Sequence, residues 1–302
     1  MKPIISLLLL FKISEMLLAQ SPCAPIILPQ FSETVKQKLE HNLFLAKENL
    51  VKDPADADAI IWYGRRTAYL GNYLQAISIF SEGIKLHPND ARFFRHRGHR
   101  YLTVRCFDKA ISDFEKAAQL INAKTDEIEP DGMPNEKNIP TSTLQSNIWY
   151  HLGLAHYLKG DYESALKAYK KCLKVSTNND MYVATFYWYY NTLRQLGINN
   201  KFFRKDAQKQ LSKLNADIEL IENKDYLDIL LLYRNKNDSL FFEKTKSQVA
   251  LSNATLSFGL GNYYLINGEV QKAKEVFEKI VRGNQWASFG FIVAETTILK
   301  LK

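Results

Sequence analysis

Small, apolar and aromatic residues recur along the chain at one fixed spacing. In the first copy, Gly64 precedes Ala76 by 12 positions, and Ala76 precedes Phe80 by 4. The three further copies are Gly98, Ala110 and Phe114; Gly153, Ala165 and Tyr169; and Gly261, Ala273 and Phe277. Residues four apart share one face of an α-helix, so the pattern predicts a helix over each alanine–aromatic pair.

The glycine of each copy predicts that a second helix packs closely on the first. Gly64 has no Cβ atom, so the backbone of the neighbouring helix can approach it, and the Phe80 ring is expected to fill the space beside Ala76. Gly71 lies between the two helical segments, where a turn is needed, and Pro88 follows the second segment, where the helix must end. Each copy is therefore predicted to be a helical hairpin.

These hairpins resemble the tetratricopeptide repeat (TPR), a helix–turn–helix unit of 34 residues. The first two copies are offset by 34 positions without a gap, and Trp149 and Leu152 match the aromatic and leucine positions of the family ahead of Gly153. The resemblance implies an all-α, TPR-type helical-hairpin solenoid, wound as a right-handed superhelix, with one inserted loop and degenerate central repeats.

The chain divides into eight predicted segments. They are a signal peptide (1–20), an N-terminal capping helix (31–53), TPR units 1 and 2 (57–124), an inserted acidic and proline-rich loop (125–144), TPR unit 3 (146–179), degenerate helical repeats (180–252), a further TPR unit (254–285) and a C-terminal capping helix (286–302). Two registers are open for the degenerate repeats. A strict 34-residue step puts Tyr187 at the small-residue position, whereas a shift by three puts Gly197 at a turn. Residues 216–252 are expected to be further helix.

The first 20 residues resemble a secretory signal peptide. Lys2 precedes an apolar run, and cleavage is expected near Ala19 or Gln20. The alternative is a buried N-terminal helix. A membrane span needs about 20 consecutive apolar residues, and the sequence has no such run. The prediction is an exported protein, periplasmic or secreted, without a transmembrane span.

The three cysteines, Cys23, Cys106 and Cys172, are an odd and sparse set that does not predict a disulfide framework. Cys23 follows the expected cleavage region, so a lipid anchor there is an alternative, disfavoured because Pro22 precedes the cysteine. Cys172 occupies a packed position after Tyr169 and is expected to be buried and inert. Cys106 lies at a helix end and is expected to be more exposed.

Five basic side chains fall within the stretch FFRHRGHRYL, residues 93–102, in a chain of net charge +8. Helical spacing puts Gly98 on the packed side and Arg95, His96 and His99 together on another stripe. In proteins similar to the TPR family, this stripe of the first helix lines a concave groove that binds extended peptides. The alternative is a solvated helix face whose charges meet only water.

The other arginines of the stretch are expected to differ in role. Arg92 should lie at the end of the stripe, and Arg100 should face elsewhere. Arg97 stands where the family usually has an apolar residue. The residues predicted to bind a partner are Trp62, Arg65, Arg92, Arg95, His96, His99, Asn147, Tyr150, His151 and Tyr157.

A groove of this composition predicts an anionic ligand, because guanidinium groups bind carboxylates and phosphates and aromatic rings flank an extended chain. Some TPR proteins bind acidic C-terminal peptides through a two-carboxylate clamp of lysine, asparagine and arginine. That clamp is not matched here, because Ile61, Arg65 and His96 replace its lysine and two asparagines. The predicted partner is another protein or peptide, with an acidic segment.

No catalytic residue, metal site or cofactor is predicted. His96 and His99 are three apart, but neighbouring arginines repel a cation and no carboxylate or cysteine lies at ligand spacing. The chain carries no phosphate-binding loop, nucleophile elbow or zinc-protease motif. One basic cluster is also not the continuous stripe that a nucleic acid follows, so no nucleic acid is expected.

The function expected is therefore a non-catalytic protein- or peptide-binding scaffold that uses the groove of the first three repeats. The alternatives are a receptor for a small anionic ligand, or an enzyme that uses the same histidines and arginines. The inserted loop adds a hypothesis, because it carries Asp126, Glu127, Glu129 and Asp131 directly after the basic repeat. Loops of this length in compact arrays are commonly functional, and this one is expected to fold against the groove and narrow or occupy it.

Overall fold

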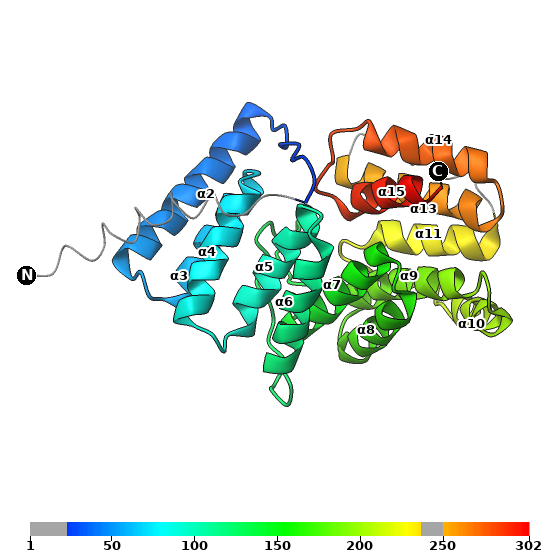
Figure 1. The fold of residues 1–302 in the computed structure, drawn as a ribbon, viewed down its shortest axis with the longest axis horizontal. Helices are drawn as coiled ribbons and strands as arrows, with labels where there is room; N and C mark the ends of the chain where they lie inside the picture. Colours follow the sequence, from blue (N-terminus) through cyan, green and yellow to red (C-terminus); the bar gives the residue numbers. More distant parts are fainter. Residues whose placement is uncertain (1–22, 237–249, 302) are drawn as a thin grey trace, which may run out of the picture. The chain divides into compact units, whose positions relative to one another are not determined.

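The computed structural model describes residues 23–236 and 250–301, which form thirteen α-helices and no strand (Figure 1). These residues divide into two compact units, here called unit 1 (up to Asp126) and unit 2 (from Glu127). The all-α, TPR-type prediction is confirmed. The predicted signal peptide, residues 1–20, lies outside the described residues.

Unit 1 contains five helices among its described residues, 23–126. They are α2 (Glu33–Lys52), α3 (Ala57–Tyr69), α4 (Tyr73–Leu86), α5 (Ala91–Thr103) and α6 (Phe107–Leu120). The helices α3 and α4 form one hairpin and α5 and α6 the next, while α4 packs on α5 and α2 on α3. Carboxylates begin both hairpins, because Asp56 accepts a hydrogen bond from the Ala59 N–H (2.7 Å) and Asp90 from the Arg92 N–H (2.9 Å).

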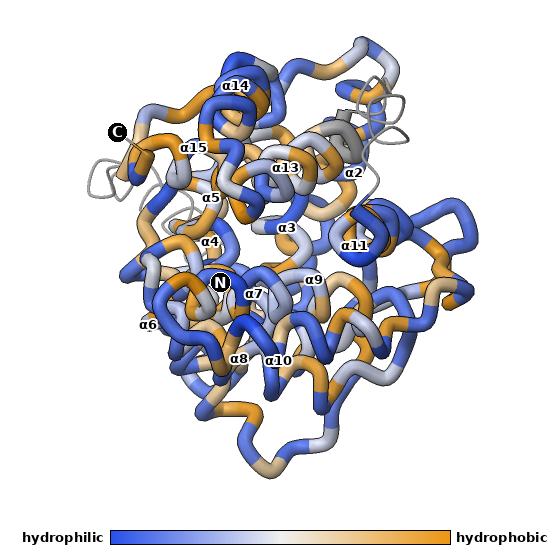
Figure 2. The backbone as a smooth tube through the Cα atoms, turned by 90° about the vertical axis from the view of Figure 1, so that its right-hand side faces the viewer, coloured by the Kyte–Doolittle hydropathy of each residue, from blue (hydrophilic) through white to orange (hydrophobic). Residues whose placement is uncertain are grey.

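Unit 2 contains eight described helices. They are α7 (Leu144–Lys159), α8 (Tyr162–Val175), α9 (Asn179–Leu196), α10 (Lys201–Ser212), α11 (Lys224–Asn235), α13 (Ala250–Ile266), α14 (Val270–Val281) and α15 (Phe289–Lys300). Hairpins pair α7 with α8, α9 with α10, and α13 with α14. The helices of both units carry hydrophilic and hydrophobic residues together, as Figure 2 shows.

The small-residue and aromatic positions meet inside each hairpin, as their spacing predicts. A Cβ atom placed on Gly64 would lie 2.4 Å from the Phe80 ring, and one on Gly153 would lie 2.6 Å from the Tyr169 ring. The rings of Phe80, Phe114, Tyr169 and Phe277 are all fully buried. The glycine therefore allows the close approach that the aromatic ring then fills.

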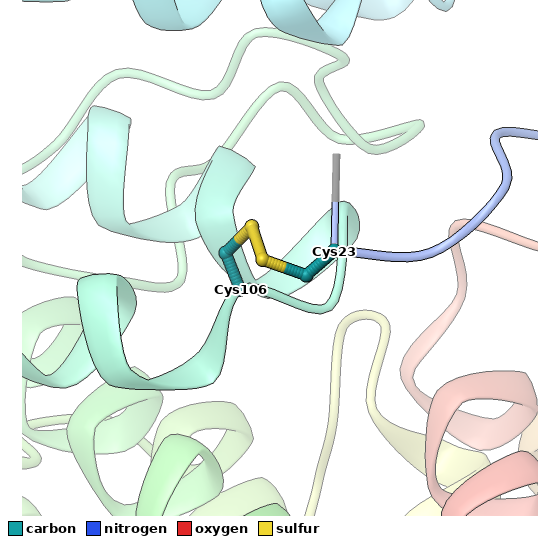
Figure 3. The surroundings of a disulfide bond; sticks show 2 residues. All are labelled: Cys23 and Cys106. Carbon is teal, nitrogen blue, oxygen red and sulfur yellow. A yellow bond between two sulfur atoms is a disulfide. The ribbon is translucent and has the colours of Figure 1, made fainter. Parts of the chain in front are cut away.

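A disulfide joins Cys23 to Cys106 and links the segment before α2 to the turn between α5 and α6 (Figure 3). The Cys23 N–H also donates to the Val104 carbonyl (3.2 Å). Nearer α2, Pro29 packs against Gly71 at the turn between α3 and α4. The segment before α2 therefore contacts the turns of both hairpins of unit 1 and is held to one of them by the disulfide.

This bond corrects two expectations from the sequence. The three cysteines do include a disulfide pair, and Cys106 is buried, not exposed. The alternative of a lipid anchor at Cys23 stays a prediction. Cys172 is not in a disulfide and is buried, as predicted, and its Sγ lies 3.3 Å from the Ser146 carbonyl oxygen.

The degenerate repeats follow the shifted register. The helix α9 ends at Leu196, and Gly197 begins the turn that leads to α10, while Tyr187 is packed in the core. The expectation of continuous helix from residue 216 is wrong at its start, because the next helix, α11, begins at Lys224. Residues 237–249 lie outside the described part of the chain.

The inserted loop has no helix, as expected, and folds onto its own unit. Its ends are joined by an isolated bridge between Ile128 and Thr143. The Thr141 carbonyl accepts a hydrogen bond from Asn178 Nδ2 (2.8 Å), and Asn135 Nδ2 donates to Glu222 (3.2 Å). These bonds attach the loop to the turn between α8 and α9 and to the residues before α11. That the loop covers the basic face of unit 1 stays a prediction.

Candidate functional site

The basic face of unit 1 is built from the first helices of two neighbouring hairpins. Arg65 on α3 and Arg95, His96, His99 and Arg100 on α5 line one cavity of about 90 Å³, and these five residues are called the basic cluster below. The cavity is completed by Ala68, Tyr69 and Phe80. The helical period predicts the grouping of Arg95, His96 and His99. Arg100, expected to face elsewhere, lines the same cavity.

The basic cluster is largely buried. Arg65, Arg95 and His96 are only 9%, 8% and 5% exposed. The His96 ring stacks on Phe80 with their centroids 5.6 Å apart. The Nη1 atom of Arg95 lies between the two histidines, 3.1 Å from His96 Nδ1 and 3.5 Å from His99 Nδ1. Since a guanidinium only donates hydrogen bonds, these histidine nitrogens are its acceptors.

Burial and like charge both act on the titration of the cluster. Burial, followed by the charge of Arg95 and its neighbours, lowers the pKa of His96 well below its ordinary value. His96 is therefore neutral at pH 7. Burial also lowers the pKa of Arg100 to about 10, which leaves this side chain protonated at pH 7. The three arginines of the cluster are cations in a poorly hydrated space.

No carboxylate is among the residues that line this cavity. Two neighbouring arginines of α5, Arg92 and Arg97, instead form ion pairs with carboxylates outside the cavity. Arg92 pairs with Asp90 (2.6 Å) and Asp58 (2.5 Å), and the hydrogen bonds that it donates to Asp90 raise the pKa of Arg92. Arg97 pairs with the buried Asp113 (2.7 Å). The sequence predicts Arg92 as a site residue, and the structure places it in ion pairs at the start of α5.

The Trp62 ring lies between Arg65 of the basic cluster and one further cation, Arg66. The Arg65 guanidinium lies 4.3 Å from the centre of the Trp62 ring, and the Arg66 guanidinium lies 4.9 Å from it. A cation over an aromatic face is attracted by the ring quadrupole. Trp62 therefore helps to hold Arg65 in place at the edge of the cavity.

The four predicted site residues of the third repeat belong to unit 2 and are packed in its interior. Asn147, Tyr150, His151 and Tyr157 are all buried. The Tyr150 hydroxyl accepts a hydrogen bond from Trp188 Nε1 (2.8 Å), and His151 Nδ1 donates to the Asn147 carbonyl (2.6 Å). Asn147, Tyr150 and His151 therefore form a packed layer at a place where the sequence predicts a groove, whereas Tyr157, although buried, lines a cavity at the end of α7.

The last described helix, α15, covers this layer of α7 side chains. Phe289 of α15 places its ring 5.5 Å from the His151 ring and 6.5 Å from the Tyr150 ring, centre to centre. At the other end of α15, Lys300 Nζ lies 3.4 Å from the Leu158 carbonyl oxygen of α7. The sequence predicts α15 only as a C-terminal capping helix, because no repeat spacing relates its residues to those of α7.

Among the described residues, no group of three or more His, Cys, Asp or Glu is placed to hold a metal ion. Likewise, no helix in the described ranges is both long and apolar enough to cross a bilayer.

Residues 146–179 match the family model for the tetratricopeptide repeat. A BBSome complex member, BBS4 of Bos taurus, is 27% identical over 150 residues, which is 50% of this chain and 24% of that protein. Small glutamine-rich tetratricopeptide repeat-containing protein 2 of Saccharomyces cerevisiae is 26% identical over 132 residues, 44% of this chain and 32% of that protein. The matched stretch thus spans between a quarter and a third of these relatives.

Two solved structures are similar in helical arrangement. One is YrrB, described as a TPR protein with an unusual peptide-binding site, at 14% identity and a TM-score of 0.42, covering 83% of this chain and 96% of that one. The other is MamA, at 16% identity and a TM-score of 0.43, covering 60% of this chain and 93% of that one.

Proposed function

We propose that this chain, a tetratricopeptide-repeat protein, is a non-catalytic scaffold whose basic cluster in unit 1 binds an acidic segment of a polypeptide partner. Proteins of this family generally act as protein-binding scaffolds. The observation that carries the finer proposal is the charge of the cavity, which three arginines line without any carboxylate. An acidic side chain of a partner is the kind of group that matches this positively charged lining.

The chemistry of the cluster favours a carboxylate held by guanidinium groups. Arg65 and Arg95 approach the cavity from two helices, and each guanidinium can donate two parallel hydrogen bonds to one carboxylate. Neutral His96 accepts from Arg95 and so orients it without adding charge. Because the arginines are mostly buried, their attraction for an anion is screened less than that of surface charges.

The size of the cavity limits which kind of ligand it can hold: a single side chain of a partner fits, but a complete small molecule does not. Small-molecule sites usually enclose about 300–1,000 Å³, whereas this cavity holds about 90 Å³. A carboxylate on an extended chain fits such a space, and the rest of the partner would lie outside it. This supports a peptide partner over a small-ligand receptor or an enzyme at the same residues.

The test is binding of a labelled peptide of alternating glutamate and serine, compared with one of alternating glutamine and serine. The acidic peptide should bind, and R65Q or R95Q should each weaken it by about tenfold or more, because a hydrogen bond to a charged group contributes about 1.5–3 kcal/mol. R282Q is the matched control, since Arg282 is an exposed arginine on unit 2. Circular dichroism melts establish that each variant is folded.

Equal binding of the two peptides, or equal binding by wild type and both cluster variants, would contradict the proposal. A cross-linked pull-down from native extract then identifies the partner. A polypeptide captured by wild type and lost from the R65Q/R95Q protein is the expected result.

We also propose that the protein is exported, either to the periplasm or as a secreted protein. The disulfide between Cys23 and Cys106 supports this, because such bonds persist in oxidising compartments and are rare in the cytosol. Mass spectrometry of the protein from its native source tests it. The mature chain should begin near Ser21, with Cys23 linked to Cys106 and no lipid attached. An intact Met1 terminus with reduced cysteines would overturn this proposal.

A further inference from the structure

A larger cavity, of about 470 Å³, lies within unit 2 at the ends of several of its helices. Its walls come from the last turns of α7, α9, α13 and α15 and from the first turns of α8 and α10. The residues that line it are Tyr157, Tyr162, Arg194, Gln195, Gly197, Ile198, Arg204, Leu265, Ile266, Thr296, Thr297, Lys300 and Leu301. This volume falls within the range of small-molecule sites.

Three cations line the cavity, and no carboxylate does. Arg194 donates to the Tyr190 hydroxyl (3.2 Å) and the Ile266 carbonyl (3.3 Å). Arg204 donates to the Gly197 carbonyl (2.9 Å) and the Ile198 carbonyl (3.0 Å), and Lys300 to the Leu158 carbonyl (3.4 Å). Within the described part of the chain, every hydrogen-bond acceptor of these three side chains is a neutral group.

The three cations bind carbonyl groups at helix ends, but these contacts neutralise only part of their positive charge. The carbonyls they contact lie at the C-terminal ends of α7, α9 and α13, where a helix carries a partial negative charge of about half a unit. Together with the C-terminal end of α15, which also lines the cavity, four such ends offset about two of the three positive charges and leave about +1. The helices α8 and α10 begin at the same turns, and their N-terminal ends add partial positive charge.

The environment of Lys300 is consistent with this charge balance. Burial lowers its pKa, and no neighbouring carboxylate acts to raise it. Its Nζ atom also lies 5.8 Å from the centre of the Tyr162 ring. Lys300 is thus a partly desolvated cation at the rim of a cavity that contains two arginines.

Apart from the amide of Gln195, the rest of the lining is apolar or carries hydroxyl groups. Tyr157 and Tyr162 present aromatic rings 5.2 Å apart at an edge-to-face angle of 68°. Leu265 and Leu301 add aliphatic surface, while Thr296 and Thr297 add hydroxyl groups. A few convergent polar groups on a mostly apolar wall are what orient a bound small molecule.

We infer that this cavity, called the unit 2 cavity below, binds a small organic anion. The ligand has one carboxylate or phosphate group, bound by Arg194, Arg204 and Lys300, and an apolar body that lies against Tyr157 and Leu265. The site shares no residue with the basic cluster of unit 1, so its test is independent of the function proposed above.

The test is isothermal titration calorimetry of the full chain with 1-naphthoate, 1-naphthyl phosphate and the neutral 1-naphthol. At least one anion should bind saturably with one molecule per chain, and naphthol should bind at least about tenfold more weakly because it lacks the charged group. Tighter binding of the naphthoate identifies a carboxylate as the preferred group, and tighter binding of the naphthyl phosphate identifies a phosphate.

Two variants locate the binding. Lys300→Gln and Arg194→Gln should each weaken the anion by about tenfold, while Lys279→Gln on the exposed side of α14 should leave it unchanged. Lys300 ends the last described helix and makes one long hydrogen bond, so its loss leaves the fold intact and the test valid even if the Arg194 variant unfolds.

The inference is overturned if neither anion binds wild type saturably, or if naphthol binds as tightly as both anions. It is also overturned if the Lys300→Gln protein binds the preferred anion as well as wild type does.

Discussion

The two units use the same repeat position for different purposes. His96 in unit 1 and His151 in unit 2 both stand two residues before the repeat glycine. His96 accepts a hydrogen bond from Arg95 beside a cavity, whereas His151 donates to the Asn147 carbonyl under the Phe289 ring. A repeat position therefore sets the direction of a side chain, and the neighbouring elements decide whether it lies beside a cavity or beneath another helix.

One position earlier, the contrast lies in charge. Arg95 precedes His96, and Tyr150 precedes His151. The Tyr150 hydroxyl bonds to Trp188 and its ring contacts Phe289, which a guanidinium at that place would not permit without a buried counter-charge. The substitution of arginine by tyrosine is thus what allows α15 to cover the face of unit 2.

The largest predicted effect concerns the disulfide, which unit 1 has and which has no equivalent among the described residues of unit 2. Replacing Cys23 with serine and Cys106 with alanine should destabilise unit 1 by about 4 kcal/mol, because the bond closes a long loop. Hydrogen exchange with mass spectrometry should show faster exchange in α3–α6 and unchanged exchange in α13–α15. Equal acceleration in both units would mean that they unfold as one.

The next effect compares two of the four repeat glycines, Gly153 of unit 2 and Gly98 of unit 1. A Cβ on Gly153 would lie 2.6 Å from the Tyr169 ring, but one on Gly98 would lie 3.1 Å from the Phe114 ring. Gly153→Ala should therefore cost about 3 kcal/mol, at the upper end for overpacking, and Gly98→Ala about 1 kcal/mol. Urea denaturation of the two variants measures the difference. The reverse order would show that the Tyr169 ring moves aside more easily than the Phe114 ring.

The third effect is the dependence of unit 1 on pH. Burial holds the pKa of His96 below that of an unfolded histidine, about 6.5. The unfolded chain therefore binds more protons below pH 6.5, and stability falls as the pH falls, by up to about 1.4 kcal/mol per pH unit. His96→Gln should remove this slope between pH 6.5 and 5 in thermal melts. An unchanged slope in the variant would assign it to another group.

The smallest effect separates Arg92 from the basic cluster. Its charge is already offset by Asp58 and Asp90, so Arg92→Gln should change binding of the acidic peptide by less than about twofold, whereas R95Q changes it by about tenfold. Loss of affinity in the Arg92 variant as large as in R95Q would extend the binding surface to the start of α5.

Several of these features can be traced in the sequence, and others cannot. The pairing of Arg92 with Asp58 joins residues that are 34 positions apart, so the repeat length itself places them side by side. Arg100 lies four residues after His96, a helical neighbour that the same period identifies. The Cys23–Cys106 disulfide and the packing of α15 on α7 cannot be traced in this way, because each joins segments that are not related by the repeat period.

By itself, the sequence determined the hairpins, the close contact of glycine with an aromatic ring, and the grouping of Arg95, His96 and His99. These depend on contacts within one helix or between a helix and the next, where spacing along the chain is distance in space. Only the tertiary structure decided that Cys23 reaches Cys106 and that α15 returns to α7. Those contacts join segments 83 or more positions apart, and they form because distant surfaces are complementary in shape, which residue spacing does not encode.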